Sequence, residues 1–174
     1  MPGDNVSGTQ DTGLPGKPNR EDAPDPPMVG RAVARLMAVQ ALFQMEASGS
    51  SLEEVRTDFS DPDFSSASSI EGHEFAEIDR DHFDVILSRA VDDQPRIDQA
   101  TDCALVARWP IDRIDPILRA VFRAAGAELL VGRVPPKVVI NEFVDVTKAF
   151  FPGSPEPGFA NAVLDHMARH LASP

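Results

Sequence analysis

Two arginines at the start of the first apolar segment are the residues best suited to binding an anionic ligand. Arg31 and Arg35 are four positions apart, so a helix would place them one turn apart on one face. Gln40 and Phe43 follow on the same segment. Guanidinium groups engage phosphates, and an aromatic ring offers the stacking platform that single-stranded RNA uses. The pattern is compatible with RNA binding, although from spacing alone solvated arginines and a core phenylalanine are the simpler interpretation.

The sequence shows no arrangement suited to catalysis or metal binding. It has no glycine-rich phosphate loop, no Cys-x-x-Cys pair and no His-Glu-x-x-His motif. His166 and His170 are one helical turn apart, but a metal site would need further ligands, and histidines near a helix end are commonly solvated. Cys103 is the single cysteine and has no activating motif, which favours a structural thiol. We expect no catalytic residue, no metal and no cofactor.

Length and charge limit the fold and the partners. A chain of 174 residues can form one domain with a real core. Its formal net charge of -12 repels polyanions at long range, so an RNA ligand would require a local basic patch or a basic partner. The sequence contains neither a signal-like amino terminus nor an apolar run of about 18 residues. These features predict a cytoplasmic protein that makes no membrane contact.

The chain divides into a tail and a helical body. Residues 1–30 are rich in proline, glycine and acidic residues and have no aromatic residue, which predicts a disordered tail. Residues 31–174 are expected to form the folded domain. Apolar residues there recur with helical spacing, and no segment alternates with period two, so the body should be all-α. The expected helices cover approximately residues 31–48, 51–59, 79–93, 95–106, 116–131, 135–150 and 158–171, with loops at 60–78 and 151–158.

Five short stretches carry a family resemblance: Arg35–Phe43, Ala120–Arg123, Val134–Glu142, Lys148–Phe150 and Phe159–Asp165. In this order they resemble the signatures of the NusB family of bacterial transcription antitermination factors, over about residues 31 to 172. The resemblance implies a compact all-α domain of about seven helices in two small bundles. It also implies a function in antitermination, in which boxA RNA of ribosomal RNA operon leaders is bound as a single strand and transcription of the rRNA genes is completed.

The same resemblance implies protein partners. The ribosomal protein NusE would form a heterodimer with the chain, and both would join the RNA polymerase antitermination complex. The free protein could also form a homodimer. The partner surface would lie on the helices at about 79–93 and 116–131, with Arg119 and Arg123 as its candidate contact residues. Asn141 and Glu142 are expected to serve hydrogen bonding within the fold, since buried polar groups generally do so.

The resemblance assigns RNA contacts to a small set of residues, which are Arg31, Arg35, Gln40, Phe43 and Phe159. The chain departs from the family where Ala32 and Val33 replace central arginines of the amino-terminal motif. Two arginines would neutralise about two phosphates, giving a salt slope of only about -1.4 on a single strand. We therefore expect weak RNA binding by the protein alone and tighter binding with NusE.

Two alternatives remain open from the sequence. The first is the RNA-binding front domain of an rRNA cytosine methyltransferase, whose helical module resembles NusB. Such an enzyme needs a large second domain, and a chain ending at Pro174 favours a protein that acts without one. The second is a helical protein-protein scaffold without RNA contact, favoured by the net charge of -12 and the missing arginines.

Overall fold

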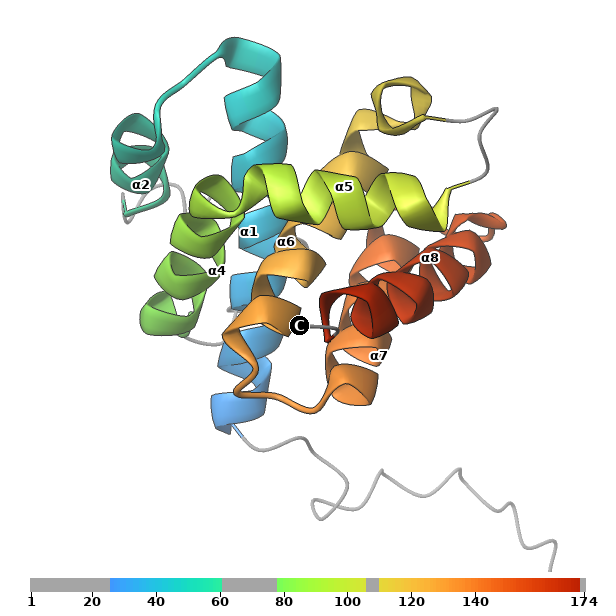
Figure 1. The fold of residues 1–174 in the computed structure, drawn as a ribbon. Coiled ribbons are helices and arrows are strands. Elements are labelled where there is room, and N and C mark those ends of the chain that lie inside the picture. The colour runs from blue at the N-terminus through green and yellow to red at the C-terminus, as the bar shows by residue number, and fades with distance from the viewer. Residues whose placement is uncertain (1–25, 61–77, 106–109, 173–174) are drawn as a thin grey trace, which may run out of the picture.

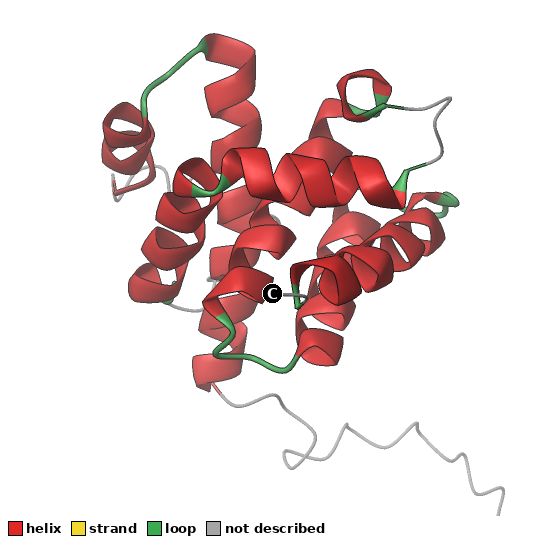
Figure 2. Cartoon of the chain, in the orientation of Figure 1, coloured by secondary structure: helices red, strands yellow, loops and turns green. Residues whose placement is uncertain are grey.

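The computed structural model describes residues 26–60, 78–105 and 110–172, and all regular elements in these ranges are helical (Figures 1 and 2). The predicted all-α fold of about seven helices is confirmed. The elements are α1 (Pro26–Ser48), α2 (Leu52–Ser60), α4 (Arg80–Asp92), α5 (Gln94–Ala104), the 3-10 turn η2 (Ile111–Arg113), α6 (Pro116–Val131), α7 (Pro136–Phe150) and α8 (Glu156–Leu171).

Local capping chemistry sets several helix boundaries where the sequence predicts them. The backbone N–H of Ser51 donates to Glu54 Oε2 at 2.7 Å, and the N–H of Glu54 donates to Ser51 Oγ at 3.3 Å, which is a capping box. Asp79 accepts a hydrogen bond from the backbone N–H of His82 at 2.9 Å and caps α4. Gly132, with φ of 68°, ends α6 in the left-handed conformation.

Two helices begin earlier than predicted. Helix α1 starts at Pro26 and not near residue 31, so residues 26–30 belong to the folded body and the predicted tail boundary is wrong by one helical turn. Gly30 is buried there, and its carbonyl accepts a hydrogen bond from the N–H of Asp79 at 3.2 Å. Helix α8 starts at Glu156, because prolines are tolerated in a first helical turn. The rest of the predicted tail, most of the predicted loop at 60–78, and residues 106–109 lie outside the described residues.

Helix α6 forms the centre of the core. Helices α1, α4, α5, α7 and α8 all pack against it (Figure 1). Its sequence is rich in small residues, and a Cβ atom added at Gly126 would lie 2.5 Å from Ile97 Cγ2 of α5. The absence of a side chain at Gly126 therefore allows α5 to approach α6 closely. This central position means that a polar side chain on the buried face of α6 needs partners from the surrounding helices.

Candidate nucleic-acid interface

Arg35 lies in the core, where only 3% of its surface is exposed. Its Nε and Nη2 atoms donate to the two carboxylate oxygens of Glu128 on α6, at 2.8 and 2.7 Å. Its Nη1 atom donates to Glu142 Oε2 on α7 at 2.8 Å. This placement contradicts the prediction that Arg35 contacts RNA, because its guanidinium is enclosed by two carboxylates of the same chain. Arg35 instead joins three helices.

His82 of α4 completes a core ion cluster that we define as Arg35, His82, Glu128 and Glu142. The Nε2 atom of His82 lies 3.3 Å from Glu128 Oε1. Burial opposes ionisation of Glu128, but its interactions with His82 and Arg35 outweigh that effect, so the pKa of Glu128 lies below its ordinary value. Sequence reasoning missed Glu128 and His82. A signal existed, since Glu128 is the one acid on a helix whose other inward-facing residues are nearly all apolar.

The pair Asn141 and Glu142 has two different environments. Glu142 pairs with Arg35 and so has the expected role within the fold, where it connects α7 to α1. Asn141 is exposed, and its side chain makes no hydrogen bond with a described residue. Among the described residues, Asn141 has no hydrogen-bond partner for its side chain, so the prediction that it serves hydrogen bonding within the fold is wrong.

Arg31 remains at the surface, as an RNA contact would require. Its side chain is half exposed, and its Nε atom lies 3.3 Å from Asp79 Oδ2. The backbone N–H of His82 is the main reason that the pKa of Asp79 lies below its ordinary value, and Arg31 adds to that shift. An exposed ion pair of this length contributes little to stability, so a phosphate could replace Asp79 as the partner of Arg31.

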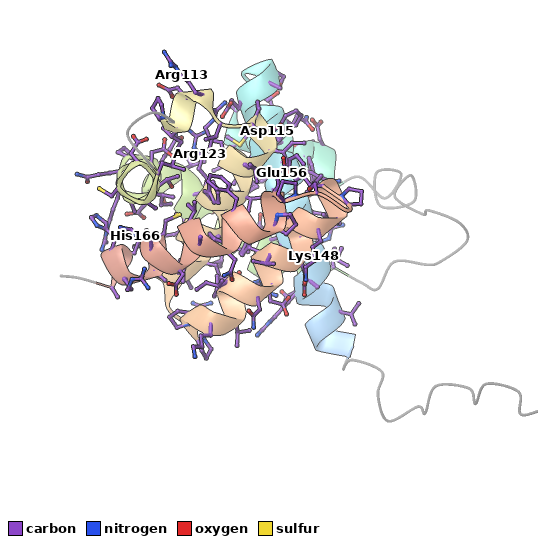
Figure 3. All side chains as sticks on the ribbon, turned by 90° about the vertical axis from the view of Figure 1, so that its right-hand side faces the viewer. Arg113, Asp115, Arg123, Lys148, Glu156 and His166 are labelled. Carbon is purple, nitrogen blue, oxygen red and sulfur yellow. The ribbon has the colours of Figure 1, made fainter. Side chains whose placement is uncertain are left out.

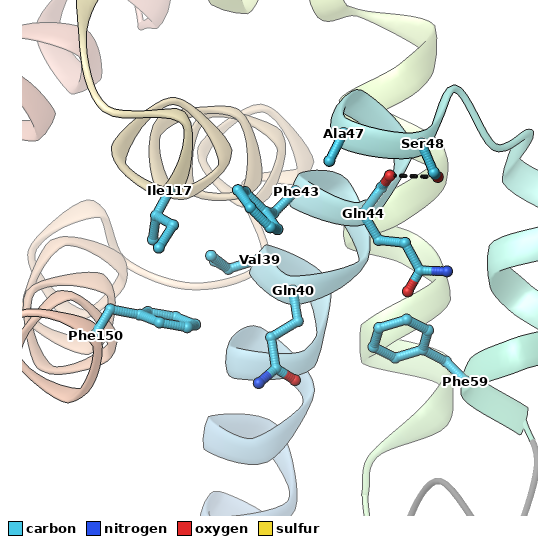
Figure 4. Close-up of a pocket in the computed structure, with 9 residues that line it drawn as sticks. All are labelled: Val39, Gln40, Phe43, Gln44, Ala47, Ser48, Phe59, Ile117 and Phe150. Carbon is cyan, nitrogen blue, oxygen red and sulfur yellow. Dashed lines mark hydrogen bonds between the residues drawn. The ribbon is translucent and has the colours of Figure 1, made fainter.

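Phe43 and Gln40 line an apolar groove on the outer face of α1 (Figure 4). Phe43 is 38% exposed, so it is not the core residue that spacing alone would favour. Its ring and that of Phe150 from α7 face the groove from one side, and Phe59 of α2 borders the other side. We call this hollow of about 450 Å³ the α1 groove, and its lining residues are Val39, Gln40, Phe43, Gln44, Ala47, Ser48, Phe59, Ile117 and Phe150.

Phe159 presents a second exposed aromatic ring, in the first turn of α8. It is 41% exposed, and it contacts the buried ring of Phe122 edge to face with 6.1 Å between the ring centroids. Lys148 and Glu156 mark the end of α7 and the start of α8, which lie close together in Figure 3. Phe159 is thus fixed at its base by Phe122 while its outer face stays open to a ligand.

Arg119 and Arg123 belong to a surface ion cluster that we define with Glu46 and Asp98. Arg119 binds both carboxylate oxygens of Glu46 at 2.5 to 3.0 Å and donates to the carbonyl of Ile111 at 2.6 Å. Arg123 binds both oxygens of Asp98 at 2.9 Å and reaches Glu46 at 2.8 Å. The hydrogen bond from Arg119 is the main cause of a lowered pKa at Glu46. Both arginines therefore already hold carboxylates, and the structure does not present them as free cations for a partner.

The other sequence candidates lie apart from these surfaces. His166, His170 and Cys103 are exposed. Among the described residues, no group of three or more His, Cys, Asp or Glu side chains is placed to hold a metal ion. Within the same ranges, no helix has both the length and the apolar character needed to cross a membrane.

Comparison with known proteins connects this arrangement to one family. Residues 32–169 match the model of the NusB family. Similar relatives include the transcription antitermination protein NusB of Caulobacter vibrioides, 43% identical over 140 residues that cover 80% of this chain and 92% of the relative. The NusB protein of Rhodopseudomonas palustris is 42% identical over 142 residues, covering 81% of this chain and 82% of the relative.

Solved structures share the fold. A chain from a crystal structure of the antitermination factors NusB and NusE in complex with dsRNA superposes with a TM-score of 0.64 at 22% identity, covering 82% of this chain and 98% of that one. NusB of T. maritima gives a TM-score of 0.62 at 24% identity, covering 80% of this chain and 90% of its own. The helical arrangement is therefore common to proteins whose sequences have diverged widely.

Proposed function

The chain belongs to the NusB family, and on that basis we propose that it is a transcription antitermination factor that binds RNA together with NusE. We further propose that the RNA is the boxA element of ribosomal RNA operon leaders and that binding promotes complete transcription of rRNA genes. Relatives at more than 40% identity are named as antitermination proteins, and a structure with the same fold contains NusE and RNA. None of those names describes an enzyme.

The exposure of Phe43 and Phe159 is the observation that carries this proposal. Both rings are about two-fifths exposed, whereas Phe59, Phe83, Phe122 and Phe143 are buried. Stacking of a base on an aromatic side chain contributes about 1–3 kcal/mol, and exposed rings can stack without rearrangement of the core. Gln40 beside Phe43 could add hydrogen bonds to a base edge. We propose that these three residues and Arg31 contact the RNA.

Burial of Arg35 strengthens the expectation that the isolated protein binds RNA weakly. Of the two arginines expected to neutralise phosphates, only Arg31 stays accessible. One phosphate contact on a single strand gives a salt slope of about -0.7, and the net charge of -12 opposes association. A basic partner would supply the missing charge and further contact area. NusE is the partner that we propose.

Titration of labelled boxA RNA with this chain, with NusE and with their mixture tests the proposal. We expect the mixture to bind most tightly, and we expect Phe43→Leu and Phe159→Leu to weaken its binding by roughly fivefold to a hundredfold, since leucine keeps apolar volume but removes the ring. Thermal unfolding of each variant controls for the fold. Failure of the mixture to bind boxA would overturn the proposal, and wild-type affinity in both variants would remove the assigned aromatic contacts.

A scaffold without RNA contact is the second candidate, and two observations favour it. The net charge is -12, and Arg35 is enclosed by carboxylates. The same titration separates it from the first candidate, because a scaffold would bind NusE and leave the RNA affinity of NusE unchanged. The methyltransferase alternative is less well supported, because the chain covers 92% of a relative that is named as an antitermination protein.

A further inference from the structure

A few cations of this acidic protein have no partner of their own. Most described arginines bind a carboxylate or a backbone carbonyl, as Arg56, Arg80 and Arg89 do. Three exposed cations make no hydrogen bond or ion pair with any described residue, and they are Arg113, Arg133 and Lys137. Arg113 lies in η2, whereas Arg133 and Lys137 lie together where α6 ends and α7 begins.

The backbone that carries Arg133 and Lys137 is well defined. Gly132 turns the chain sharply at a φ of 68°, and Val134 packs against the core. Arg133 lies between these two fixed residues, so its side chain leaves the surface from a constrained position. Lys137 follows in the first turn of α7. A preorganised backbone lowers the entropy lost when such side chains bind a ligand.

This turn lies at the same end of the molecule as Arg31. Figure 1 shows α1 and α7 running in the same direction, with the α6–α7 turn at the end of the molecule where α1 begins. The ion pair between Arg35 Nη1 and Glu142 Oε2, which are 2.8 Å apart, places these two residues at the same height along α1 and α7. One turn earlier on each helix lie Arg31 and Val138, and Lys137 is next to Val138. Arg31, Arg133 and Lys137 are therefore grouped at one end of the bundle.

The acids nearest this end are mostly engaged. Asp79 caps α4 and pairs with Arg31, and Glu142 pairs with Arg35. Asp81, in the first turn of α4, is an exposed carboxylate among the described residues at this end. Helices α1, α4 and α7 begin here and α6 ends here, so the partial positive charges of three helix starts are opposed by the partial negative charge of one helix end. The local potential is thus more favourable to anions than the net charge of the chain suggests.

We propose that Arg133 and Lys137 are a phosphate-binding pair that extends the RNA contact of Arg31 around the start of α7. This proposal rests on the proposed function and deepens it. The pair compensates for Ala32 and Val33, which stand where the family resemblance places arginines. Asn141 is exposed one turn after Lys137, and its free amide could bind a sugar or a base edge. The ligand is the phosphodiester backbone of a single RNA strand.

Salt-dependent RNA binding by the full chain with NusE tests the pair. The variant Arg133→Gln/Lys137→Gln removes two cations from exposed positions. We expect roughly tenfold weaker binding of labelled boxA RNA at low salt, and a plot of log affinity against log salt that is shallower by about 1.4. The matched control is Arg113→Gln, which removes an exposed, unpartnered cation from η2, at the opposite end of the molecule (Figures 1 and 3). We expect the control to keep wild-type affinity.

Each other result has a defined meaning. Because the control removes one cation and the double variant removes two, a loss of log affinity in Arg113→Gln of half that of the double variant or more would indicate a general charge effect and overturn the proposal. An unchanged salt slope in the double variant, together with lost binding in Phe159→Leu, would overturn the phosphate pair and leave the proposed function intact. Weaker binding of NusE to the double variant without RNA would assign the two cations to a protein contact instead. Absence of RNA binding by the wild-type mixture would overturn both proposals.

Discussion

The core ion cluster and the surface ion cluster use the same chemistry in two different environments. Each brings arginine side chains against two carboxylates from other helices at hydrogen-bond distance. In the core cluster, Arg35 and Glu128 have side chains exposed by only 4% and 2%. In the surface cluster, Arg119 is 10% exposed and its partner Glu46 keeps 32% of its side chain exposed, close to the 29% of Glu142 at the edge of the core cluster. Desolvation therefore separates two arrangements that look alike as lists of bonds.

This difference determines which arginines can have a second partner. A buried guanidinium that loses its carboxylates is left without water, whereas a half-buried one can exchange a carboxylate for solvent or for a group on another molecule. Arg35 is therefore a structural residue of the NusB fold in this chain. Arg123, with 16% of its side chain exposed, could take part in exchange only if Glu46 or Asp98 released it.

Replacement of Arg35 is expected to have the largest effect on stability. Arg35→Met leaves Glu128 buried without its main partner, which should lower the free energy of unfolding by about 3–5 kcal/mol. Urea denaturation followed by circular dichroism measures this change. The double variant Arg35→Met/Glu128→Leu removes both buried charges and should recover most of the loss. If the double variant were no more stable than Arg35→Met, lost packing and not an unpaired charge would explain the effect.

The expected loss of stability on replacing Arg35 also limits what RNA-binding experiments with arginine variants can show. A variant that combines Arg31→Ala with Arg35→Ala would be destabilised by the loss of Arg35, so weaker RNA binding by it would not show that either residue contacts RNA. Arg31→Ala alone is the informative substitution, because its ion pair with Asp79 is exposed and contributes at most about 1 kcal/mol.

The second-largest effect on the free energy of unfolding is expected on acidification, which should remove the contribution of Glu128 in the core cluster. The folded pKa of Glu128 lies below its unfolded value of about 4.3, so its stabilising effect is present above pH 4.3 and is lost as the pH falls through the folded pKa. Glu128→Gln should lower the unfolding free energy by about 1–3 kcal/mol at pH 7. The gap between wild type and this variant should narrow below about pH 4.3 in urea titrations. A gap that widened on acidification would show that the folded pKa is raised.

The sequence predicted the helices well because their signals are local. The Ser51 capping box, the Asp79 cap and Gly132 act on residues within one turn, so they can be identified without knowledge of the tertiary structure. The start of α1 was missed because its evidence is not local. Gly30 is buried only because other helices cover it, and its carbonyl binds the N–H of Asp79, 49 positions later.

The candidate site could be predicted only in part, for the same reason. The sequence predicted RNA contacts at Arg31, Gln40, Phe43 and Phe159, and all four have some surface exposure. It misplaced Arg35, since that residue is buried through partners 93 and 107 positions away. It also missed Arg133 and Lys137, because in the sequence alone every exposed cation looks equally available. What distinguishes them is that neighbouring carboxylates hold most of the others.

A single substitution in the surface cluster should have a smaller effect than any core change. Glu46→Gln removes the carboxylate shared by Arg119 and Arg123, but Asp98 and the carbonyl of Ile111 remain as partners. We expect a loss of about 1 kcal/mol in the unfolding free energy. Thermal unfolding of Glu46→Gln and of Glu128→Gln under the same conditions compares the two losses of stability. A loss as large as that of Arg35→Met would mean that the two clusters are not distinguished by desolvation.

The smallest expected effect is the salt dependence of the coupling energies, which should differ between the surface cluster and the core cluster. A double-mutant cycle of Glu46→Gln and Arg123→Met should give a coupling energy of about 0.5 kcal/mol at low salt that falls further in 1 M salt, because the Debye length drops to about 3 Å. A cycle of Glu128→Gln and Arg35→Met should give a larger coupling with little salt dependence, since ions cannot approach a pair that is almost fully buried. Equal salt sensitivity in both cycles would show that solvent enters the core cluster, and Arg35 would again be a candidate for contact with RNA.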